Sequence, residues 1–485
     1  MKYPLPHHYR LPDTPALWAG EYPGHEVESE ARSRVQALLD TGVSFFVDLT
    51  EEGELFEYDH LLAELTPAGH PRPIHRRHPI RDVSTPKAGY EMEVILDTID
   101  EALADGHQVY VHCWGGIGRT GTTVGCWLVR QGHDGPSALG EVERLFGATL
   151  KGQAGRRSPE TSAQRDWVKA WRHETPQTEP GAPSREDRLV GALIGLAVGD
   201  ALGTTLEFKA LGTFEPITDM TGGGPFRLAP GQWTDDTSMA LCLAESLVAC
   251  GGFDAADQMR RYVRWWRKGH LSSTGRCFDI GNTVRAALSR FEDNGNPFAG
   301  VTDPRSAGNG SLMRLAPVVM YYADDPRTAI EMAAESSRTT HAAPEAVDAC
   351  RYFAALLSGA FRGLPKDRLL NTTYVDRMGF WHRAPLTPKI REVAAGSYHV
   401  RQVRGSGYVT ECLEAALWAF ANTDDFRSGA LAAANLGDDA DTTTAVYGQL
   451  GGAYYGLEGI PLEWRTRLHQ SSAIIDLARR LAEGR

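Results

Sequence analysis

Two short acidic runs in the C-terminal half of the chain have the residue types that hold a hard cation. Residues 231–238 read Gly-Gln-Trp-Thr-Asp-Asp-Thr-Ser, and residues 437–443 read Gly-Asp-Asp-Ala-Asp-Thr-Thr. Adjacent carboxylates repel each other and are costly to desolvate, so their placement beside threonine hydroxyls favours a cation among them. Neither run has a neighbouring Cys or His that would favour zinc. Oxygen ligands of this kind suit Mg²⁺ or Mn²⁺.

Both runs also stand where a helix is expected to begin. The first precedes an apolar series that continues to Leu247, and the second precedes one that reaches Leu450. Threonine and aspartate are favoured at helix N-termini, because they accept hydrogen bonds from free backbone N–H groups and complement the helix dipole. Either run alone is therefore explained equally well as a helix cap. The occurrence of two such runs favours a shared cation site.

A third motif, residues 112–121, reads His-Cys-Trp-Gly-Gly-Ile-Gly-Arg-Thr-Gly and lies between a predicted strand and a predicted helix. A glycine-rich turn at a helix start presents a ring of backbone N–H groups that can hold phosphate. The same donors favour a thiolate at Cys113, the form that attacks phosphorus. Arg119 has the planar fork that grips two phosphoryl oxygens, and Thr120 could hydrogen-bond the departing sulfur. The predicted phosphate-binding residues are those of the turn: Trp114, Gly115, Gly116, Ile117, Gly118 and Arg119.

The Cys-x5-Arg spacing, with the preceding His112 and the following threonine, resembles the protein tyrosine and dual-specificity phosphatase superfamily over about residues 20–172. The resemblance implies catalysis through a phosphocysteine, without a cofactor, and a general acid on a separate loop. An acid is needed because an alkoxide or phenoxide leaves poorly unless it is protonated. Residues 80–86 resemble that loop and make Asp82 the candidate, with a solvated turn residue as the alternative. A basic run, residues 75–78 with Arg81, could attract an anionic substrate or form a solvated face.

Length and composition limit what can position these motifs. The chain has 485 residues, so two or three domains are expected, and its net charge of -12 argues against a general nucleic-acid binder. The seven cysteines lack paired Cys-x-x-Cys spacings, which predicts neither a disulfide framework nor a zinc ribbon and fits a reducing cytoplasm. The N-terminus has no apolar signal segment, and the longest apolar stretch, 189–202, is too short to span a bilayer. We therefore expect a cytoplasmic protein without a membrane partner.

Hydrophobic periodicity predicts a multidomain chain. Between about residues 20 and 172, buried strands at 44–49 and 109–111 alternate with helical segments, which predicts an N-terminal α/β domain with a central sheet, residues 1–175. A proline-rich stretch, 176–184, is predicted to be a linker. Helical patterns dominate residues 185–485, which predicts a C-terminal all-α domain. Its first helix has glycines four residues apart that would permit close helix packing: Gly191, Gly195, Gly199 and Gly203.

The loops and helix starts of the second domain together resemble the ADP-ribosylglycohydrolase family over about residues 184–484. The resemblance rests on several motifs in order: residues 199–207, 222–225, 231–238, 306–314, 340–341 and 437–443. It implies two Mg²⁺ or Mn²⁺ ions with these ligands: Thr234, Asp235, Asp236, Asp439, Asp441 and Thr442. It makes Glu207 a mobile glutamate near the scissile bond. It places these residues against ADP-ribose: Ser306, Gly308, Asn309, Gly310 and His341. Asp438 stands where the family more often has glycine, and this extra acid could lie behind the ligands.

The chain is therefore predicted to be a bifunctional hydrolase that acts on ADP-ribosylated or phosphorylated proteins or small molecules. Cleavage of the glycosidic bond builds oxocarbenium character, so it needs an oriented ribose, a nearby carboxylate and an activated water. The two halves could act on one molecule. One alternative is that the second half only binds ADP-ribose and targets the phosphatase. Another is that the phosphatase half acts on phosphoinositides or nucleotides, and the acceptor of the ADP-ribosyl group stays open.

Overall fold

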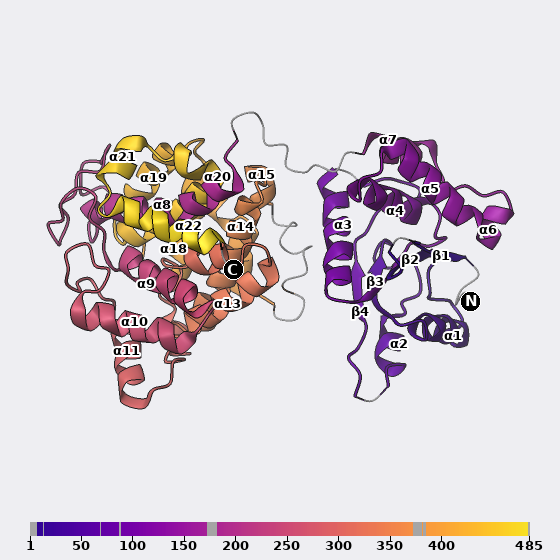
Figure 1. Cartoon of the computed structure of the whole chain (residues 1–485), viewed down its shortest axis with the longest axis horizontal. Coiled ribbons are helices and arrows are strands. Elements are labelled where there is room, and N and C mark those ends of the chain that lie inside the picture. The colour runs from indigo at the N-terminus through magenta and orange to yellow at the C-terminus, as the bar shows by residue number, and fades with distance from the viewer. Residues whose placement is uncertain are drawn as a thin grey trace. The chain divides into compact units, whose positions relative to one another are not determined.

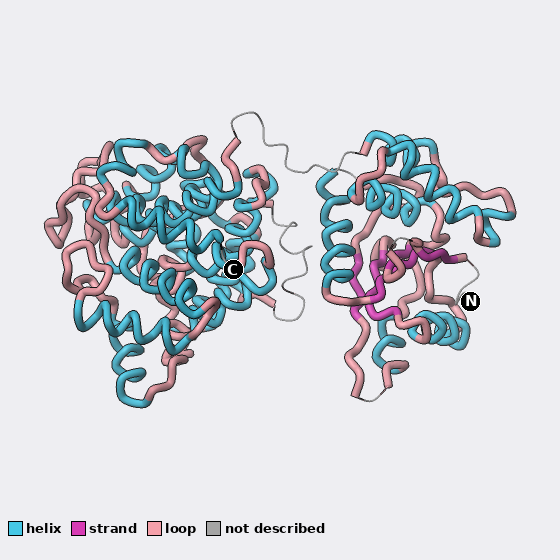
Figure 2. Tube along the Cα trace, in the orientation of Figure 1, coloured by secondary structure: helices cyan, strands magenta, loops and turns pink. Residues whose placement is uncertain are grey.

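Strands and helices are distributed unevenly along the chain (Figures 1 and 2). The computed structural model describes residues 7–12, 14–67, 69–86, 89–171, 182–371, 381 and 385–483. The chain divides into two compact units, Met1–Thr175 and Pro176–Arg485. Every named strand of the described residues lies in the first unit, and the second is built from helices. Residues 172–181, which hold most of the predicted linker, lie outside the described residues.

The first unit is built on a five-stranded sheet in the order β1-β2-β5-β3-β4. Its strands are β1 (His8–Arg10), β2 (Leu17–Gly20), β3 (Val43–Asp48), β4 (Ile74–Arg77) and β5 (Gln108–His112). β1 is antiparallel to β2, and the other pairs are parallel. In the register, Asp48 lies opposite both His112 and Arg77, and Gly20 lies opposite His112. The carboxyl ends of the four parallel strands therefore meet at the edge where the Cys-x5-Arg loop begins.

Helices cover both faces of this sheet, because alternate strand residues point to opposite sides. One face, with Val109 and Val111, packs against α3 (Gly89–Ala104), α4 (Gly118–Arg130), α5 (Gly135–Gly147) and α7 (Ser162–Ala170). The other, with Tyr110, packs against α1 (Glu28–Leu39) and α2 (Asp59–Glu64). A short helix, α6 (Leu150–Gln153), follows α5. The predicted α/β domain with a central sheet is confirmed.

The second unit is organised around α8 (Arg185–Gly203) and α20 (Ala440–Gly459), whose backbones touch. A Cβ at Gly195 would lie 2.1 Å from Gly448 O, and one at Gly199 would lie 2.2 Å from Thr444 O. No residue larger than glycine fits such a contact. The predicted close packing of the α8 glycines is therefore confirmed. By length and composition, residues 185–206 could cross a membrane, but 94% of their apolar window is buried inside the structure, as in a core helix.

The other helices of this unit surround α8 and α20 and share one continuous apolar core. α9 (Asp235–Cys250) begins at the first acidic run, and α20 begins at the second. The long surrounding helices are α10 (Ala255–Lys268), α11 (Asn282–Asn294), α13 (Pro326–Arg338), α14 (Pro344–Phe361), α18 (Val409–Ala421) and α22 (Ser471–Glu483). Shorter elements complete the unit: η1 (Thr204–Leu206), η2 (Pro304–Ser306), α12 (Ala316–Tyr321), α15 (Lys366–Leu369), α17 (Pro388–Ala394), η3 (Ser397–His399), α19 (Phe426–Ala434) and α21 (Leu462–Arg467). The all-α prediction is confirmed.

Candidate active sites

The first acidic run is anchored to α8 by Asp200, a buried aspartate that sequence reasoning misses as a site residue. Asp200 Oδ1 accepts hydrogen bonds from the N–H and Oγ1 of Thr234, both 2.9 Å long. Asp200 Oδ2 accepts from the N–H and Oγ1 of Thr237, at 3.0 and 2.6 Å. These bonds satisfy N–H groups at the start of α9 and fix that helix end on α8. Asp200 lies 34 residues before Thr234, so no local capping pattern reveals its role.

The second acidic run meets the first at this helix end. Thr234 Oγ1 lies 3.2 Å from Asp236 Oδ2 and 3.3 Å from Asp441 Oδ2. Thr442 Oγ1 lies 3.4 Å from Asp236 Oδ2. Carboxylate oxygens of Asp200, Asp236 and Asp441 lie within 4.8 Å of one another. Four of the predicted metal ligands are thus brought together around one point.

A second group of carboxylates adjoins the first. Oxygens of Glu207, Asp279 and Asp441 also lie within 4.8 Å of one another, so Asp441 belongs to both groups. Glu207 directly follows η1, and Asp279 lies three residues before α11. Asp279 is missed by sequence reasoning because it is a single acid in a stretch without apolar periodicity. The remaining predicted ligands, Asp235 and Asp439, line the cleft into which these carboxylates open.

Negative charge accumulates at this centre, and no described Lys or Arg forms an ion pair with its carboxylates. Burial and then the neighbouring carboxylates raise the pKa of Glu207 to about 9 and that of Asp279 to about 8. The same causes raise the pKa of Asp441 well above its ordinary value. Among the described residues, Asp236 Oδ1, Asp441 Oδ1 and Glu207 Oε2 are buried without a hydrogen-bond partner. Unpaired carboxylate oxygens in two adjoining groups fit a pair of hard divalent cations.

The acidic centre opens into a cleft of about 510 Å³. Six carboxylates line this cleft: Glu207, Asp235, Asp279, Asp438, Asp439 and Asp441. Among the described lining residues, Arg285 is the one arginine or lysine. The predicted ADP-ribose loop contributes Gly308, Asn309 and Gly310 to the lining. Ser306, the other residue of this loop predicted to contact ADP-ribose, lies outside the lining. It is the last residue of η2, and its N–H donates to the Asp303 carbonyl.

Asn309 ties the loop to the second acidic run. Its Nδ2 donates to Asp439 Oδ2 at 2.7 Å and to the Ser406 carbonyl at 3.3 Å. Its backbone N–H donates to the Gly407 carbonyl at 3.2 Å. Burial raises the pKa of Asp439 although this amide bond opposes the shift. Asn309 therefore orients a predicted metal ligand and a wall of the cleft at the same time.

His341 lies directly behind the glycines of this loop. A Cβ at Gly310 would lie 2.8 Å from His341 Cε1, so the ring leaves no room for a side chain at that position. Burial and then the charge of Arg314 lower the pKa of His341 to about 3, so the imidazole is neutral at pH 7. Arg314 donates to the Gly310 carbonyl, to Tyr262 Oη at 2.6 Å and to Thr340 Oγ1 at 2.9 Å. This buried arginine therefore fixes the position of the loop through the Gly310 carbonyl.

Three residues that line the cleft adopt the left-handed backbone region although none is glycine. Phe208, Asp279 and Asp438 have φ angles of 60°, 57° and 58°. Such conformations cost about 1–2 kcal/mol each and persist where the surrounding structure enforces them. Phe208 N–H donates to the Asp438 carbonyl, and Asp438 N–H donates to the Lys209 carbonyl, each at 2.7 Å. Asp438, for which a place behind the ligands was expected, is instead exposed on the cleft wall.

In the first unit, the Cys-x5-Arg loop joins β5 to α4 at the carboxyl edge of the sheet. Cys113 is 3% exposed, and Gly118 opens α4. The Arg119 guanidinium is buried and donates to the carbonyls of Leu49 and Ile80 at 3.3 and 3.0 Å. Arg119, predicted to grip a phosphoryl group, is thereby fixed between the loops that follow β3 and β4.

Two carboxylates face this guanidinium. Glu54 accepts two hydrogen bonds from Arg119, of 2.6 and 2.8 Å, and sequence reasoning misses it because its loop has no recognisable pattern. Asp82, the predicted acid, has Oδ1 at 2.8 Å from the same guanidinium, and its side chain is 45% exposed. The segment that follows it is held by Gln164 Nε2, which donates to the Ser84 carbonyl at 2.9 Å. The predicted acid therefore lies beside the loop that carries the predicted nucleophile, Cys113.

Thr120 lies within the first turn of α4, next to Arg119 in the chain. Its side chain is fully buried, and its hydroxyl has no hydrogen-bond partner among the described residues. A buried hydroxyl without a partner is uncommon in folded proteins. The predicted role of Thr120, to donate to the sulfur of Cys113, would satisfy this hydroxyl.

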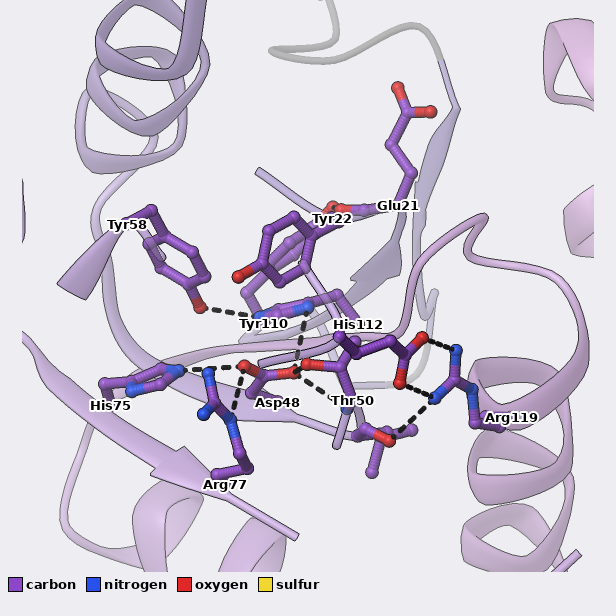
Figure 3. A network of polar contacts seen from close by, with 12 residues as sticks. Glu21, Tyr22, Asp48, Thr50, Tyr58, His75, Arg77, Tyr110, His112 and Arg119 are labelled. Carbon is purple, nitrogen blue, oxygen red and sulfur yellow. Dashed lines mark hydrogen bonds and ion pairs between the residues drawn. The ribbon is translucent and has the colours of Figure 1, made fainter. Parts of the chain in front are cut away.

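A buried polar network surrounds Asp48 at the end of β3 (Figure 3). The Asp48 carboxylate accepts from Thr50 N–H and Oγ1 at 2.9 and 2.7 Å, from His75 Nε2 at 3.1 Å and from Arg77 Nε at 3.2 Å. Burial alone would raise the pKa of Asp48, but His112 and these hydrogen bonds outweigh it and hold the pKa below its usual range. His75 and Arg77 were candidates to attract substrate or to form a solvated face. Their side chains instead bind the buried carboxylate of Asp48.

The same network contacts His112, which immediately precedes Cys113. His112 Nε2 lies 2.6 Å from Tyr58 Oη, and His112 Nδ1 lies 3.8 Å from Asp48 Oδ1. Burial lowers the pKa of His112 to about 4, although Asp48 opposes the shift. The contacts fix the last residue of β5, and therefore the point at which the loop leaves the sheet (Figure 3).

Comparison with known proteins relates both units to hydrolases. A family model described as ADP-ribosylglycohydrolase matches residues 181–485, and one described as Polymorphic toxin system, DSP-PTPase phosphatase, matches residues 24–133. ADP-ribosylarginine hydrolase Tri1 of Serratia proteamaculans is 41% identical over 326 residues, which cover 67% of this chain and 86% of that protein. Its namesake from Pseudomonas putida is 46% identical over 298 residues, 61% of this chain and 78% of that protein. A solved structure named ADP-ribosylglycohydrolase-related protein complex is 47% identical and covers 62% of this chain and 99% of its own, with a TM-score of 0.55.

Proposed function

The chain belongs to the ADP-ribosylglycohydrolase family and carries a DSP-PTPase phosphatase domain ahead of it, and from this premise we propose that its C-terminal unit cleaves ADP-ribose from arginine with two divalent cations. The observation that carries the proposal is the convergence of two distant acidic runs on one cleft. Asp441 belongs to both carboxylate groups there, and three buried carboxylate oxygens lack hydrogen-bond partners among the described residues. Two Mg²⁺ or Mn²⁺ ions would supply the missing positive charge.

The charge of the cleft favours arginine as the acceptor. Six carboxylates line the cleft, and Arg285 is the one arginine or lysine among the described lining residues. Negatively charged side chains therefore outnumber positively charged ones. With all six ionised, the carboxylates and Arg285 carry a net charge of -5, which two divalent ions would bring to -1. This residual negative charge suits a guanidinium leaving group better than a neutral serine or acetate. Two relatives are named ADP-ribosylarginine hydrolases.

Each part of the reaction would depend on particular residues of the cleft. When bound, the two ions supply Lewis acidity that orients sugar hydroxyls and makes water more acidic. The six predicted ligands would hold them: Thr234, Asp235, Asp236, Asp439, Asp441 and Thr442. Asp200 would fix the helix start on which the first three lie. Glu207 and Asp279, which line the cleft, would move protons between water and the glycosidic nitrogen. Water then adds to the anomeric carbon as the bond to the guanidine nitrogen breaks.

The N-terminal unit would hydrolyse phosphate monoesters in two steps. Cys113 Sγ attacks phosphorus, and the leaving oxygen takes a proton from Asp82, which lies next to Arg119. Water then attacks the phosphocysteine and gives a proton to Asp82, which the first step left ionised, and the sulfur departs as a thiolate with a hydrogen bond from Thr120. Arg119 would hold two phosphoryl oxygens in both steps, for which the phosphate must replace Glu54 or Asp82 as its partner.

A single set of assays tests both halves. The intact protein, Cys113→Ser and Asp235→Ala would be incubated with ADP-ribosylated arginine and with p-nitrophenyl phosphate, with and without a chelator. We expect Asp235→Ala and the chelator to abolish release of free ADP-ribose only, and Cys113→Ser to abolish release of phosphate only. Binding of ADP-ribose without any release would instead make the second unit a targeting module. Release of ADP-ribose that survives complete removal of divalent ions would contradict the metal-dependent mechanism.

A further inference from the structure

Three backbone carbonyls of the Cys-x5-Arg loop are bound from outside the loop. Trp114 O accepts from the Tyr22 N–H at 2.9 Å, and Gly115 O accepts from Lys151 Nζ at 2.9 Å. Ile117 O accepts from Ser158 Oγ at 2.8 Å and also from the Gly121 N–H of α4 at 3.2 Å. The donors come from three segments that are distant in the chain: the segment after β2, helix α6 and the stretch before α7. The loop is therefore held by its carbonyls.

The direction of a carbonyl fixes the direction of the next N–H, because the trans peptide unit is planar and its C=O and N–H point to opposite sides. The three outer bonds therefore turn the N–H groups of Gly115, Gly116 and Gly118 away from their donors. None of the N–H groups of residues 114–118 donates to another described residue. Amide groups that converge without partners at the start of a helix form a nest for an anion.

Lys151 is the one donor of the three that carries a charge. Its ammonium also lies 2.9 Å from Glu21 Oε2, so the carboxylate holds the lysine against the loop. α6 does not depend on this side chain for its own start, because Thr149 Oγ1 accepts from the Gly152 N–H. The lysine thus has no evident task in α6 itself.

We propose that Lys151 is a positioning residue for phosphate transfer, which fixes the Gly116 N–H toward the phosphate through the Gly115 carbonyl. The inference rests on the proposed phosphatase function and adds a residue that no sequence motif marks. Without the lysine, the peptide between Gly115 and Gly116 would lose its outer partner and could rotate, and the anion would lose one oriented donor. Removal of a directly oriented donor costs about 10²–10³ in rate, so loss of its outer support should cost less.

The full chain is tested as Lys151→Met, Lys151→Arg and Glu21→Gln, with Lys169→Met as a matched control. Lys169 lies on α7 of the same unit, 3.4 Å from Asp166. Binding of inorganic phosphate is measured by calorimetry in the Cys113→Ser background, and kcat and KM for p-nitrophenyl phosphate with Cys113 present. We expect Lys151→Met to weaken phosphate binding and kcat/KM about 10-fold. Lys151→Arg and Glu21→Gln, which keep a donor for Gly115, should stay within about threefold of the parent.

The outcomes separate this inference from the function on which it rests. A parent protein that neither binds phosphate nor hydrolyses the ester overturns the proposed function and the inference with it. An active parent with an unchanged Lys151→Met variant overturns the inference alone. So does a loss in Glu21→Gln as large as that in Lys151→Met, because the ion pair and not the carbonyl contact would then be responsible. If Lys151→Met fails to fold while Lys151→Arg is fully active, the lysine is structural and the inference is overturned.

Discussion

Thr234 Oγ1 lies 3.3 Å from Asp441 Oδ2, although 207 residues separate them in the chain. Two helix contacts explain this approach. The start of α9 is bound to α8 through Asp200, and α20 packs along α8 with backbone against backbone. α8 therefore supports both acidic helix starts. A change in the carboxylates and a change in this support should affect the same activity.

Substitution of Asp441 should exchange activity for stability. In metal-free buffer, Asp441→Asn removes one of several buried, mutually repelling carboxylates, so we expect the free energy of unfolding to rise by about 1 kcal/mol. Mg²⁺ at 100 times its dissociation constant should stabilise the parent by about 2.7 kcal/mol and the variant far less. Urea unfolding with and without Mg²⁺ measures both effects. Asp324→Asn, which removes an exposed partner of Arg185, is the control and should keep the full Mg²⁺ response.

A methyl group between α8 and α20 should disturb the metal centre from a distance. A Cβ at Gly448 would lie 2.0 Å from the Gly195 carbonyl oxygen, so Gly448→Ala must push the helices apart. We expect a loss of about 3 kcal/mol in unfolding free energy and a marked fall in ADP-ribose release. The three nearest atoms to a Cβ at Gly451, on the same helix, belong to the Tyr447 side chain, the closest at 3.0 Å, so Gly451→Ala meets no backbone at that distance and should cost clearly less than Gly448→Ala. Equal effects of the two substitutions would contradict the packing argument.

Loss of the acid in the phosphatase should depend on the leaving group. Asp82→Asn cannot protonate the departing oxygen, so kcat for an alkyl phosphate should fall by about 100-fold. p-Nitrophenolate leaves without much assistance, and its release should fall far less. Steady-state assays with both esters give the ratio. Asp97→Asn removes a partner of Arg130, which lies at the opposite end of α4 from Arg119, and should leave both rates unchanged. A uniform loss for both esters would remove Asp82 from this role.

The buried His341 should make the C-terminal unit sensitive to acid. Its folded pKa of about 3 lies below the value near 6.5 of an unfolded histidine, because burial and Arg314 disfavour its charge. The unfolded state therefore binds the proton first, so stability is complete above pH 6.5 and is lost as the pH falls toward 3. At pH 5 the histidine alone should cost about 2 kcal/mol relative to pH 8. Urea unfolding at the two pH values should show a smaller loss for His341→Gln than for the parent. Parallel losses would show that His341 does not titrate in this way.

Patterns of local sequence suffice for most of the fold. Apolar residues at helical spacing mark α9, α10 and α22, and uninterrupted apolar residues mark β3 and β5, because these elements bury a face of their own. β1 and β2 have only three and four residues, too few for a periodic signal. β4 is an edge strand of mostly charged residues whose partner, Asp48, lies on β3. Its apolar content gives no sign of a strand.

Local sequence patterns likewise reveal some of the site residues and miss others. The acidic runs and the Cys-x5-Arg loop are visible because the required residues lie within a few positions of each other. Asp279 and Glu54 are single acids in irregular loops, and they reach their sites only through tertiary contacts with Asp441 and Arg119. Asp200 is hidden inside an apolar helix, since its hydrogen-bond partners belong to another one. Such residues are recognised only when the backbone path is known.

The contact between α8 and α20 sets the separation of the two helices through backbone atoms. The carbonyl oxygens of Gly195 and Gly448 each occupy the space of the other residue's missing Cβ. Peptide groups have the same dimensions in every protein, so the separation of the two helices does not depend on which apolar side chains fill the surrounding core. Substitutions in the surrounding core should therefore be able to reshape the walls of the cleft while the glycine contact keeps the spacing between Asp200 and Asp441.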